Sequence, residues 1–331
     1  MSIIIGNMNN PHIDFGFIIL HYMAQEMTED CVEDLLKKFS SYNIIIVVVD
    51  NASPDGSGRN IEKKYIDNPL VKVILHTKND GFARGNNVGF SYLKKHYDIN
   101  YMVVMNNDVF IKSEDFLEQI PIIYSEHQFD VLGPDVYATK LKCHQNPQSY
   151  TIPDLPKIEY LIKEYKKQIR NDNFQYYKLK ILHYLVFWWA KLILKYLFPR
   201  KYQQIQSSKA SQGNDIVGSD NYDKNVVFNA VLQGACLIFS KEFIEKQDYA
   251  FFPETFLYFE EQILALQCIN KKYKIMYHPS ISVDHLCSVS TEVVYGNGHK
   301  KSQLFWSECI KSLKIYKKLY LEYDASYSIA S

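Results

Sequence analysis

Apolar residues in the first 135 positions alternate between short continuous runs and runs with helical spacing. The continuous runs, typical of buried parallel strands, lie at residues 13–20, 44–49, 71–75, 101–105 and 129–132. Helical spacing predicts helices at 26–39 (with Thr28 as its cap), 59–67, 86–95 and 114–124. This alternation predicts an α/β fold with an open, mostly parallel sheet and helices on both faces.

Three polar clusters follow three successive predicted strands. Residues 50–53 (DNAS) follow the second strand, residues 79–87 (NDGFARGNN) the third, and residues 106–108 (NND) the fourth. Because ligands of such sheets bind at the carboxyl ends of the strands, we expect the three clusters to line one crevice. Turn formation alone would explain one such cluster, but it explains three in succession poorly.

The residue types in these clusters suit a nucleotide sugar. The carboxylate of Asp50 can accept hydrogen bonds from a ribose or a base, and Gly81 lets backbone N–H groups approach phosphate oxygens at a helix N-terminus. Arg84 adds a permanent positive charge. Asp108 and the amides before it offer oxygen ligands for Mg²⁺ or Mn²⁺ on a diphosphate. Neither G-x-G-x-x-G nor a Walker A loop occurs here, which disfavours NAD enzymes and P-loop ATPases.

Six motifs in order carry a resemblance to a known family. They are VVDNASPDGSG at 48–58, NDGFARGNNVGF at 79–90, MNNDVFI at 105–111, QGACLIFSKEF at 233–243, FLYFEEQILALQ at 256–267 and HPSISVDHLCSVS at 278–290. They resemble the family 2 glycosyltransferases, especially the rhamnosyltransferase-like branch. The resemblance implies a GT-A type, Rossmann-like fold, a nucleotide-diphosphate sugar donor, a divalent metal (Mg or Mn) and inversion at the anomeric carbon.

The resemblance also implies roles for single residues. The donor-binding residues would be Tyr22, Asp50, Asn51, Ser53, Asn79, Gly81, Arg84, Asn106 and Asn107. Asp108, the last residue of a DXD-like motif, and His285 would bind the metal, although His285 could also be a core histidine. Gln233 and Gly234 would face the acceptor.

The catalytic base would lie at the start of the helix that contains Glu260 and Glu261. The family usually has Glu-Asp there and a second Asp two residues later, where this chain has Ile263. Either Glu260 or Glu261 can be the base, with Glu261 at the usual position, and Glu260 could instead simply stabilise a helix N-terminus. The missing Asp keeps open a non-catalytic scaffold that binds nucleotide sugars. A sugar nucleotidyltransferase fits less well, because its glycine-rich loop should lie near the N-terminus.

Charge is distributed unevenly although the totals balance. The chain has 37 basic and 37 acidic residues, which argues against a nucleic-acid partner. Residues 157–201 nevertheless carry a net charge of +8, and apolar residues within 181–197, including Trp188 and Trp189, recur at helical spacing. One or two helices are expected over 157–198, followed by a polar loop at 207–221 and a further helix at 304–320. Such a basic amphipathic helix can bind anionic lipid, or it can pack on the core or on a second copy of the chain.

Together these patterns divide the chain into four segments. Residues 1–135 would bind the nucleotide sugar, 136–228 form a helical basic insertion, 229–290 supply the acceptor and catalytic half, and 291–331 form C-terminal helices. We expect an inverting transferase with a donor such as dTDP-rhamnose and a glycan or lipid-linked glycan acceptor of surface polysaccharide assembly. No secretory signal or membrane-spanning run is evident, and the six cysteines form no CxxC pair. We therefore expect the protein to be cytoplasmic and bound peripherally to the inner face of a bacterial membrane.

Overall fold

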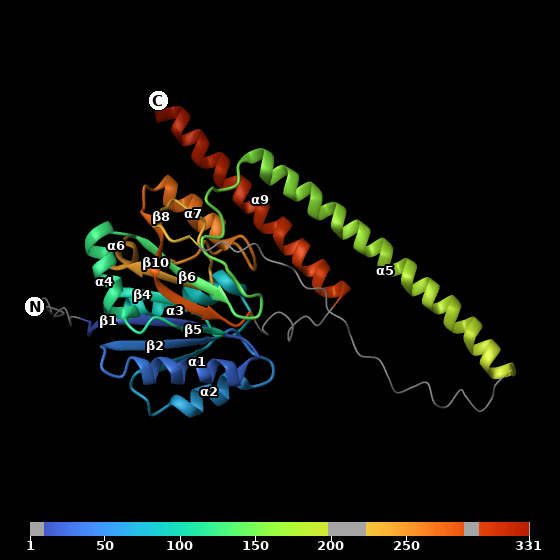
Figure 1. Ribbon diagram of the computed structural model, residues 1–331, viewed down its shortest axis with the longest axis horizontal. Coiled ribbons are helices and arrows are strands. Elements are labelled where there is room, and N and C mark those ends of the chain that lie inside the picture. The colour runs from blue at the N-terminus through green and yellow to red at the C-terminus, as the bar shows by residue number, and fades with distance from the viewer. Residues whose placement is uncertain (1–9, 198–222, 288–297, 331) are drawn as a thin grey trace, which may run out of the picture.

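One sheet with helices on both faces forms the body of the molecule, and two long helices extend along its side (Figure 1). This computed structural model describes residues 10–197, 223–287 and 298–330, with side chains up to 180 in the first range and up to 324 in the last. The polar loop predicted at 207–221 lies outside the described residues.

The first half of the sheet has the predicted strand–helix alternation. Its parallel strands run in the order β3-β2-β1-β4. They are β1 (His12–His21), β2 (Ile44–Asp50), β3 (Val71–Leu75) and β4 (Asp98–Asn106). The helices between them are α1 (Gln25–Lys38), α2 (Ser57–Tyr65) and α3 (Gly81–His96). All seven residues of β2 are buried, as expected for a strand covered on both faces.

The second half of the sheet continues from β4 in the order β9-β6-β10-β5. The strands are β5 (Val109–Ile111), β6 (Val131–Ala138), β9 (Cys236–Ser240) and β10 (Ile275–His285), with short β7 (Cys143–His144) and β8 (Val227–Phe228) paired to β6 and β10. Strand β9 is antiparallel to both β4 and β6, whereas β6 and β10 are parallel. The helices are α4 (Phe116–His127), α6 (Lys241–Lys246) and α7 (Glu260–Asn270). Through these pairings the late motifs join the same sheet as the early ones.

Two long helices lie side by side and pack against α7 (Figure 1). They are α5 (Leu155–Leu197) and α9 (His299–Ala330), so the segment 157–198 forms one helix up to Leu197, and the last helix is longer than predicted. Ile158, Ile263 and Tyr316 meet in a buried apolar cluster between these helices. A hydrogen bond of 2.6 Å between His299 Nδ1 and Asp172 Oδ2 also joins them. No helix of the described residues is long and apolar enough to cross a membrane.

Two local predictions were wrong. Thr28 does not cap α1, which begins at Gln25; it lies inside the helix, where its hydroxyl donates to the Ala24 carbonyl. Helix α3 begins at Gly81 rather than Asn86, so most of the glycine-rich cluster is helical. Its small residues let the helix pack closely on the sheet, since a Cβ on Gly85 would come within 2.5 Å of the Leu20 side chain.

Candidate active site

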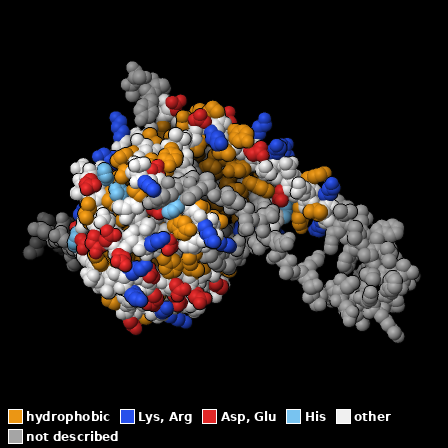
Figure 2. All heavy atoms as spheres, viewed as in Figure 1, with side chains coloured by type: hydrophobic (Ala, Val, Ile, Leu, Met, Phe, Trp, Pro, Cys, Tyr) orange, Lys and Arg blue, Asp and Glu red, His pale blue; other side chains and the backbone are white. Residues whose placement is uncertain are grey.

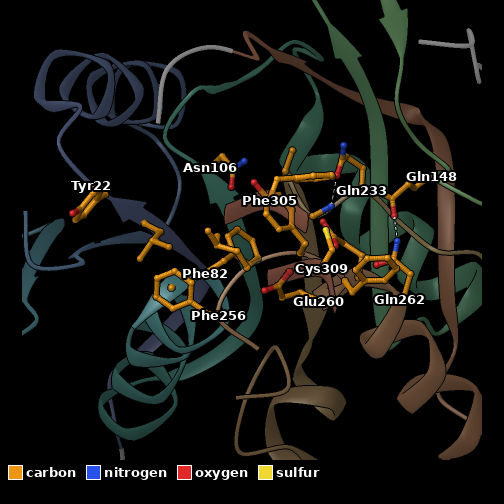
Figure 3. Close-up of a pocket in the computed structure, with 18 of the residues that line it drawn as sticks. Tyr22, Phe82, Asn106, Gln148, Gln233, Phe256, Glu260, Gln262, Phe305 and Cys309 are labelled. Atoms are coloured by element: carbon orange, nitrogen blue, oxygen red, sulfur yellow. Dashed lines mark hydrogen bonds between the residues drawn. The ribbon is translucent and has the colours of Figure 1, made fainter. Parts of the chain in front are cut away.

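A pocket of about 460 Å³ lies along the sheet edge where β1, β2, β4 and β10 end. Six predicted donor-binding residues line one end: Tyr22, Asn51, Asn79, Gly81, Asn106 and Asn107. Five further predicted residues line its middle: Gln233, Gly234, Glu260, Glu261 and His285. Figure 3 shows Tyr22 at one end, Gln148 and Gln262 at the other, and Glu260 between them. The three polar clusters therefore meet at one crevice, as their positions after the strands predicted.

Asn51 holds the loop that enters α3. Its side-chain nitrogen donates to Asn79 Oδ1 and to the Gly81 carbonyl, both at 3.0 Å. Its oxygen accepts from the backbone N–H of Asp80 at 3.0 Å. Because every polar atom of this amide is engaged with the loop, Asn51 shapes the donor end of the pocket.

Gly81 joins the two halves of the site. Its φ of +78° is a conformation that favours glycine, and a Cβ there would lie 2.0 Å from the Phe256 carbonyl oxygen. That oxygen accepts a hydrogen bond of 2.8 Å from the N–H of Phe82. The glycine-rich turn is therefore in direct contact with the loop that precedes Glu260.

Asn107 belongs to a buried chain of hydrogen bonds behind the pocket. Its side chain donates to Thr28 Oγ1 at 2.9 Å, and Thr28 Oγ1 lies 2.7 Å from Nδ1 of His21. The other ring nitrogen of His21 is 2.8 Å from Ser57 Oγ. This network fixes the turn between β4 and β5, so the buried Thr28 has a structural role in the site.

Four predicted residues are not among those lining the pocket. Asp50 is buried and accepts from the Ser53 N–H at 3.1 Å, while Ser53 Oγ accepts from the Met23 N–H at 3.0 Å. Arg84 is exposed on α3, and its Nε donates to the Pro253 carbonyl at 2.5 Å. The fourth, Asp108, contacts the pocket residue His285. Direct donor contacts by Asp50, Ser53 and Arg84 remain predictions.

Asp108 and His285 form a close pair. The antiparallel pairing of β5 with β10 brings them together, with 3.4 Å between Asp108 Oδ1 and His285 Nε2 and both side chains 13% exposed. Burial lowers the pKa of His285, but hydrogen bonding and charge from Asp108 and Cys287 outweigh it and raise the pKa to about 9. On the other side of the ring, Nδ1 is 2.8 Å from Gln145 Oε1.

This pair fits a divalent cation on a diphosphate. Within the described part of the chain, no three His, Cys, Asp or Glu side chains cluster as a complete metal site. Mg²⁺ and Mn²⁺ on nucleotides, however, usually take one or two protein ligands and complete their shell with phosphate oxygens and water. Because the raised pKa keeps the free imidazole protonated at neutral pH, a cation would displace the Nε2 proton on the Asp108 side, while Nδ1–H donates to Gln145.

The turn before α7 places the two glutamates. Tyr258 and Phe259 have φ values of 70° and 67°, two successive non-glycine residues in the left-handed region. Such a conformation costs about 1–3 kcal/mol per residue and is concentrated at functional sites. It brings Glu260 and Glu261, in the first turn of α7, into the pocket.

The two carboxyl groups differ in their surroundings. Burial raises the pKa of both, and the charge of Glu261 raises the pKa of Glu260 further, to about 8. Glu260 is 3% exposed, and its Oε1 has no hydrogen-bond partner among the described residues. The N–H of Gly234 stabilises the charged form of Glu261, and a Cβ on Gly234 would lie 2.6 Å from Glu261 Oε1. The proton of this pair therefore resides preferentially on Glu260, and the charge on Glu261.

Other pocket residues were missed by the sequence analysis. They are Gln148, Tyr165, Tyr258, Gln262, Phe305 and Cys309; Figure 3 shows Gln148 and Gln262 at the end opposite Tyr22, with Phe305 and Cys309 nearer the middle. Tyr258 and Gln262 flank the glutamates inside a recognised motif, so their proximity could have been inferred. Tyr165 and Phe305 come from α5 and α9, and nothing in their local sequence marks them as pocket residues.

Comparisons with known proteins identify the family of this chain. Residues 17–188, more than half of the chain, match the model of glycosyl transferase family 2. The glycosyltransferase GlyG of Streptococcus pneumoniae is 29% identical over 116 residues, which cover 35% of this chain and 36% of GlyG, so the match spans about a third of that relative.

Two solved structures are also similar. GalNAc-T7 with UDP, GalNAc and Mn²⁺ has a TM-score of 0.50 at 10% identity, over 90% of this chain and 48% of that one. Staphylococcus aureus TarS (residues 1–349) with UDP-GlcNAc has a TM-score of 0.32 at 22% identity, over 38% and 35% of the two chains. The expected GT-A type α/β fold is confirmed. The chain thus belongs to glycosyl transferase family 2.

Proposed function

We propose that this protein transfers a sugar from a nucleotide diphosphate to a saccharide hydroxyl, with inversion at the anomeric carbon. Membership of family 2 supports a nucleotide-sugar donor. The observation that carries the proposal is the position of the Glu260–Glu261 pair, in the same pocket as the asparagines of the donor end and His285. A candidate base and a candidate diphosphate-binding region are thereby combined in one pocket.

In the proposed reaction the nucleotide occupies the end lined by Tyr22, Asn51 and Asn79, and its diphosphate lies toward Asn106 and His285. Asp108 and His285 would hold a divalent cation, which supplies charge neutralisation of the leaving diphosphate. Glu261 accepts the proton of the acceptor hydroxyl. The acceptor oxygen forms a bond to the anomeric carbon while the bond from that carbon to the diphosphate oxygen breaks.

The presence of Ile263, where the family usually has Asp, is weak evidence for a non-catalytic scaffold. Ile263 is fully buried in the apolar cluster between α5, α7 and α9 and is not among the residues lining the pocket. Its apolar side chain therefore matches its surroundings, and both glutamates remain in the pocket. We favour the enzyme over the scaffold for this reason.

A panel of nucleotide sugars tests the proposal. UDP-, GDP- and dTDP-linked sugars are incubated with Mn²⁺ or Mg²⁺ and methyl glycosides, and nucleoside diphosphate release and glycoside product are measured. We expect one donor class to be consumed with a product of inverted configuration, and dTDP-rhamnose is the first donor to try, given the resemblance to the rhamnosyltransferase-like branch. Binding of a nucleotide sugar without consumption would instead favour the scaffold.

We further propose that the acceptor is a lipid-linked glycan of surface polysaccharide assembly, and that the enzyme reaches it at the inner face of a bacterial membrane. Exposed side chains of α5 support this proposal. Tyr160, Phe174, Tyr177 and Leu179 are each more than half exposed. Lysines and an arginine alternate with them, as the orange and blue side chains along the described part of this helix show in Figure 2. Aromatic and basic side chains on one exposed helix suit an anionic lipid surface. The side chains of 181–197, including Trp188 and Trp189, lie outside those that the structure describes.

Vesicle sedimentation tests this membrane contact. We expect binding to vesicles of phosphatidylglycerol and phosphatidylcholine that weakens with salt, since each basic residue near the surface contributes about 1 kcal/mol. Replacing Lys166 and Arg170 by Gln should weaken binding mainly at low salt, and Phe174→Ser at all salt concentrations.

Ile122→Ser, at an exposed apolar residue of α4, is the matched control and should bind normally. Equal recovery with pure phosphatidylcholine, or none with either vesicle, would contradict lipid binding. A concentration-dependent dimer that Phe174→Ser dissociates would show that α5 contacts a second copy instead.

A further inference from the structure

The pocket end opposite Tyr22 is built largely by elements outside the sheet. Tyr165 of α5, Phe305 of α9 and Tyr258 of the loop before α7 form what we call the aromatic wall. The Tyr258 and Phe305 rings are 4.8 Å apart at 74°, and the Tyr165 and Phe305 rings are 6.1 Å apart at 73°. The rings pack edge to face, so the wall is a contiguous aromatic cluster that begins beside the two glutamates.

Firm contacts hold the wall in place. Ser312 of α9 donates to the Leu257 carbonyl at 3.1 Å, and Tyr316 donates to the Pro153 carbonyl at 2.9 Å. Both bonds join α9 to segments that flank the pocket. Since α5 and α9 also share a buried apolar cluster with α7, the wall is packed directly against the helix of Glu260.

Polar atoms without partners lie next to this apolar surface. Gln262 donates to Gln148 Oε1 at 2.7 Å, a bond that Figure 3 shows at the far end of the pocket. Gln262 Oε1 is buried and has no hydrogen-bond partner among the described residues, and the same holds for Glu260 Oε1. Gln262 as a whole is only partly buried and lines the pocket, as does Gln148, so polar side-chain amides flank the aromatic wall.

We propose that the aromatic wall and Gln262 form the acceptor subsite, and that it takes a neutral pyranoside. One face of a pyranose ring carries several C–H bonds and packs on an aromatic ring, while its hydroxyls hydrogen-bond to the side-chain amides of Gln262 and Gln148, which line the pocket. The acceptor hydroxyl then points to Glu261. A lipid chain would bring no hydrogen-bonding groups to these amides, and an anionic group would be repelled by Glu261. This assignment rests on the proposed transfer reaction and adds the residues that select its acceptor.

Saturation-transfer NMR with methyl glycosides tests the subsite. The probes are the methyl glycosides of glucose, galactose, N-acetylglucosamine and rhamnose, added to the full chain with UDP or dTDP and Mn²⁺. We expect at least one to bind the wild type, and Phe305→Ala and Gln262→Leu each to weaken it about tenfold, equivalent to loss of one aromatic or hydrogen-bond contact. Phe305→Trp should keep binding because it keeps a flat aromatic ring.

Nucleotide affinity separates this proposal from the proposed function. Calorimetry with UDP and dTDP should give the same affinity for Phe305→Ala as for the wild type, because the nucleotide lies at the other end. Phe174→Ala, at an exposed phenylalanine of α5 outside the pocket, is the matched control and should change neither readout. Binding of no glycoside to the wild type, unchanged glycoside binding in both variants, or an equal loss of nucleotide affinity would overturn the subsite. Failure of the wild type to bind either nucleotide would instead refute the proposed function.

Discussion

Replacing Glu261 by Gln should lower the rate of sugar transfer by about 100-fold or more, the usual scale for loss of a general base. The amide has the size of the carboxylate but cannot accept the acceptor proton. Within the pair, the charge resides preferentially on Glu261, because the backbone N–H groups of Glu261 and Gly234 stabilise its charged form against burial. Donor affinity should stay within about twofold, since the donor end is built by other residues. Steady-state kinetics with the donor found in the panel, together with nucleotide calorimetry, measure both effects.

Glu260→Gln is the matched control. Glu260 is protonated at neutral pH, so a neutral amide replaces a neutral acid and the rate at pH 7 should fall much less than in Glu261→Gln. If Glu260→Gln alone abolishes transfer, the base is Glu260. If neither change lowers transfer, the pair is not catalytic.

The stability of this control variant reports the protonation of Glu260. The folded-state pKa of about 8 lies above the ordinary value of 4.5, so the folded protein binds this proton more tightly than the unfolded chain does. The contribution of this proton to the free energy of unfolding is fully present below about pH 4.5 and is lost as the pH rises to about 8. The free energy of unfolding of Glu260→Gln, measured relative to wild type, should therefore increase as the pH rises from 5 to 9. Denaturant titrations at several pH values measure this difference. A constant difference would contradict a raised pKa.

The sequence predicted those features that depend on local pattern. Continuous apolar runs identified the parallel strands, and polar clusters directly after them identified the sheet edge where the pocket lies. Asn51, Asn79 and Gly81 meet there because each lies within a few residues of a strand end. Parallel strands place such positions together regardless of the loops between them.

Features that depend on long-range packing could not be predicted. Gln145 reaches His285 across 140 residues, through the pairing of β7 with β6 and of β6 with β10. The aromatic wall requires α5 and α9 to pack on α7, a contact between helices whose apolar patterns fit several partners. Arg84 was expected at the diphosphate, but a side chain on a helix can reach several directions, and here it contacts the Pro253 carbonyl.

Removing the Asp108 carboxylate should abolish the gain in nucleotide affinity that Mn²⁺ provides. Asp108→Asn keeps the size of the side chain but loses the charge that pairs with His285 and would hold the cation. We expect the Mn²⁺-dependent increase in affinity for UDP or dTDP to fall by at least about tenfold, the scale seen when metal sites lose supporting groups. Calorimetry of each nucleotide with and without Mn²⁺ measures this gain directly.

Asp284→Asn is the matched control for Asp108→Asn. Asp284 is the neighbour of His285 on β10, where successive side chains point to opposite faces, and its carboxylate lies 3.5 Å from Lys112. Its replacement removes the same charge from the same region without touching the Asp108–His285 pair. An equal loss in both variants would show that general electrostatics, not metal ligation, supports nucleotide binding. The metal site would be refuted if the nucleotide binds equally well without Mn²⁺ and if Asp108→Asn leaves this binding unchanged. Asp108 is the carboxylate that pairs with His285 Nε2 in the proposed site.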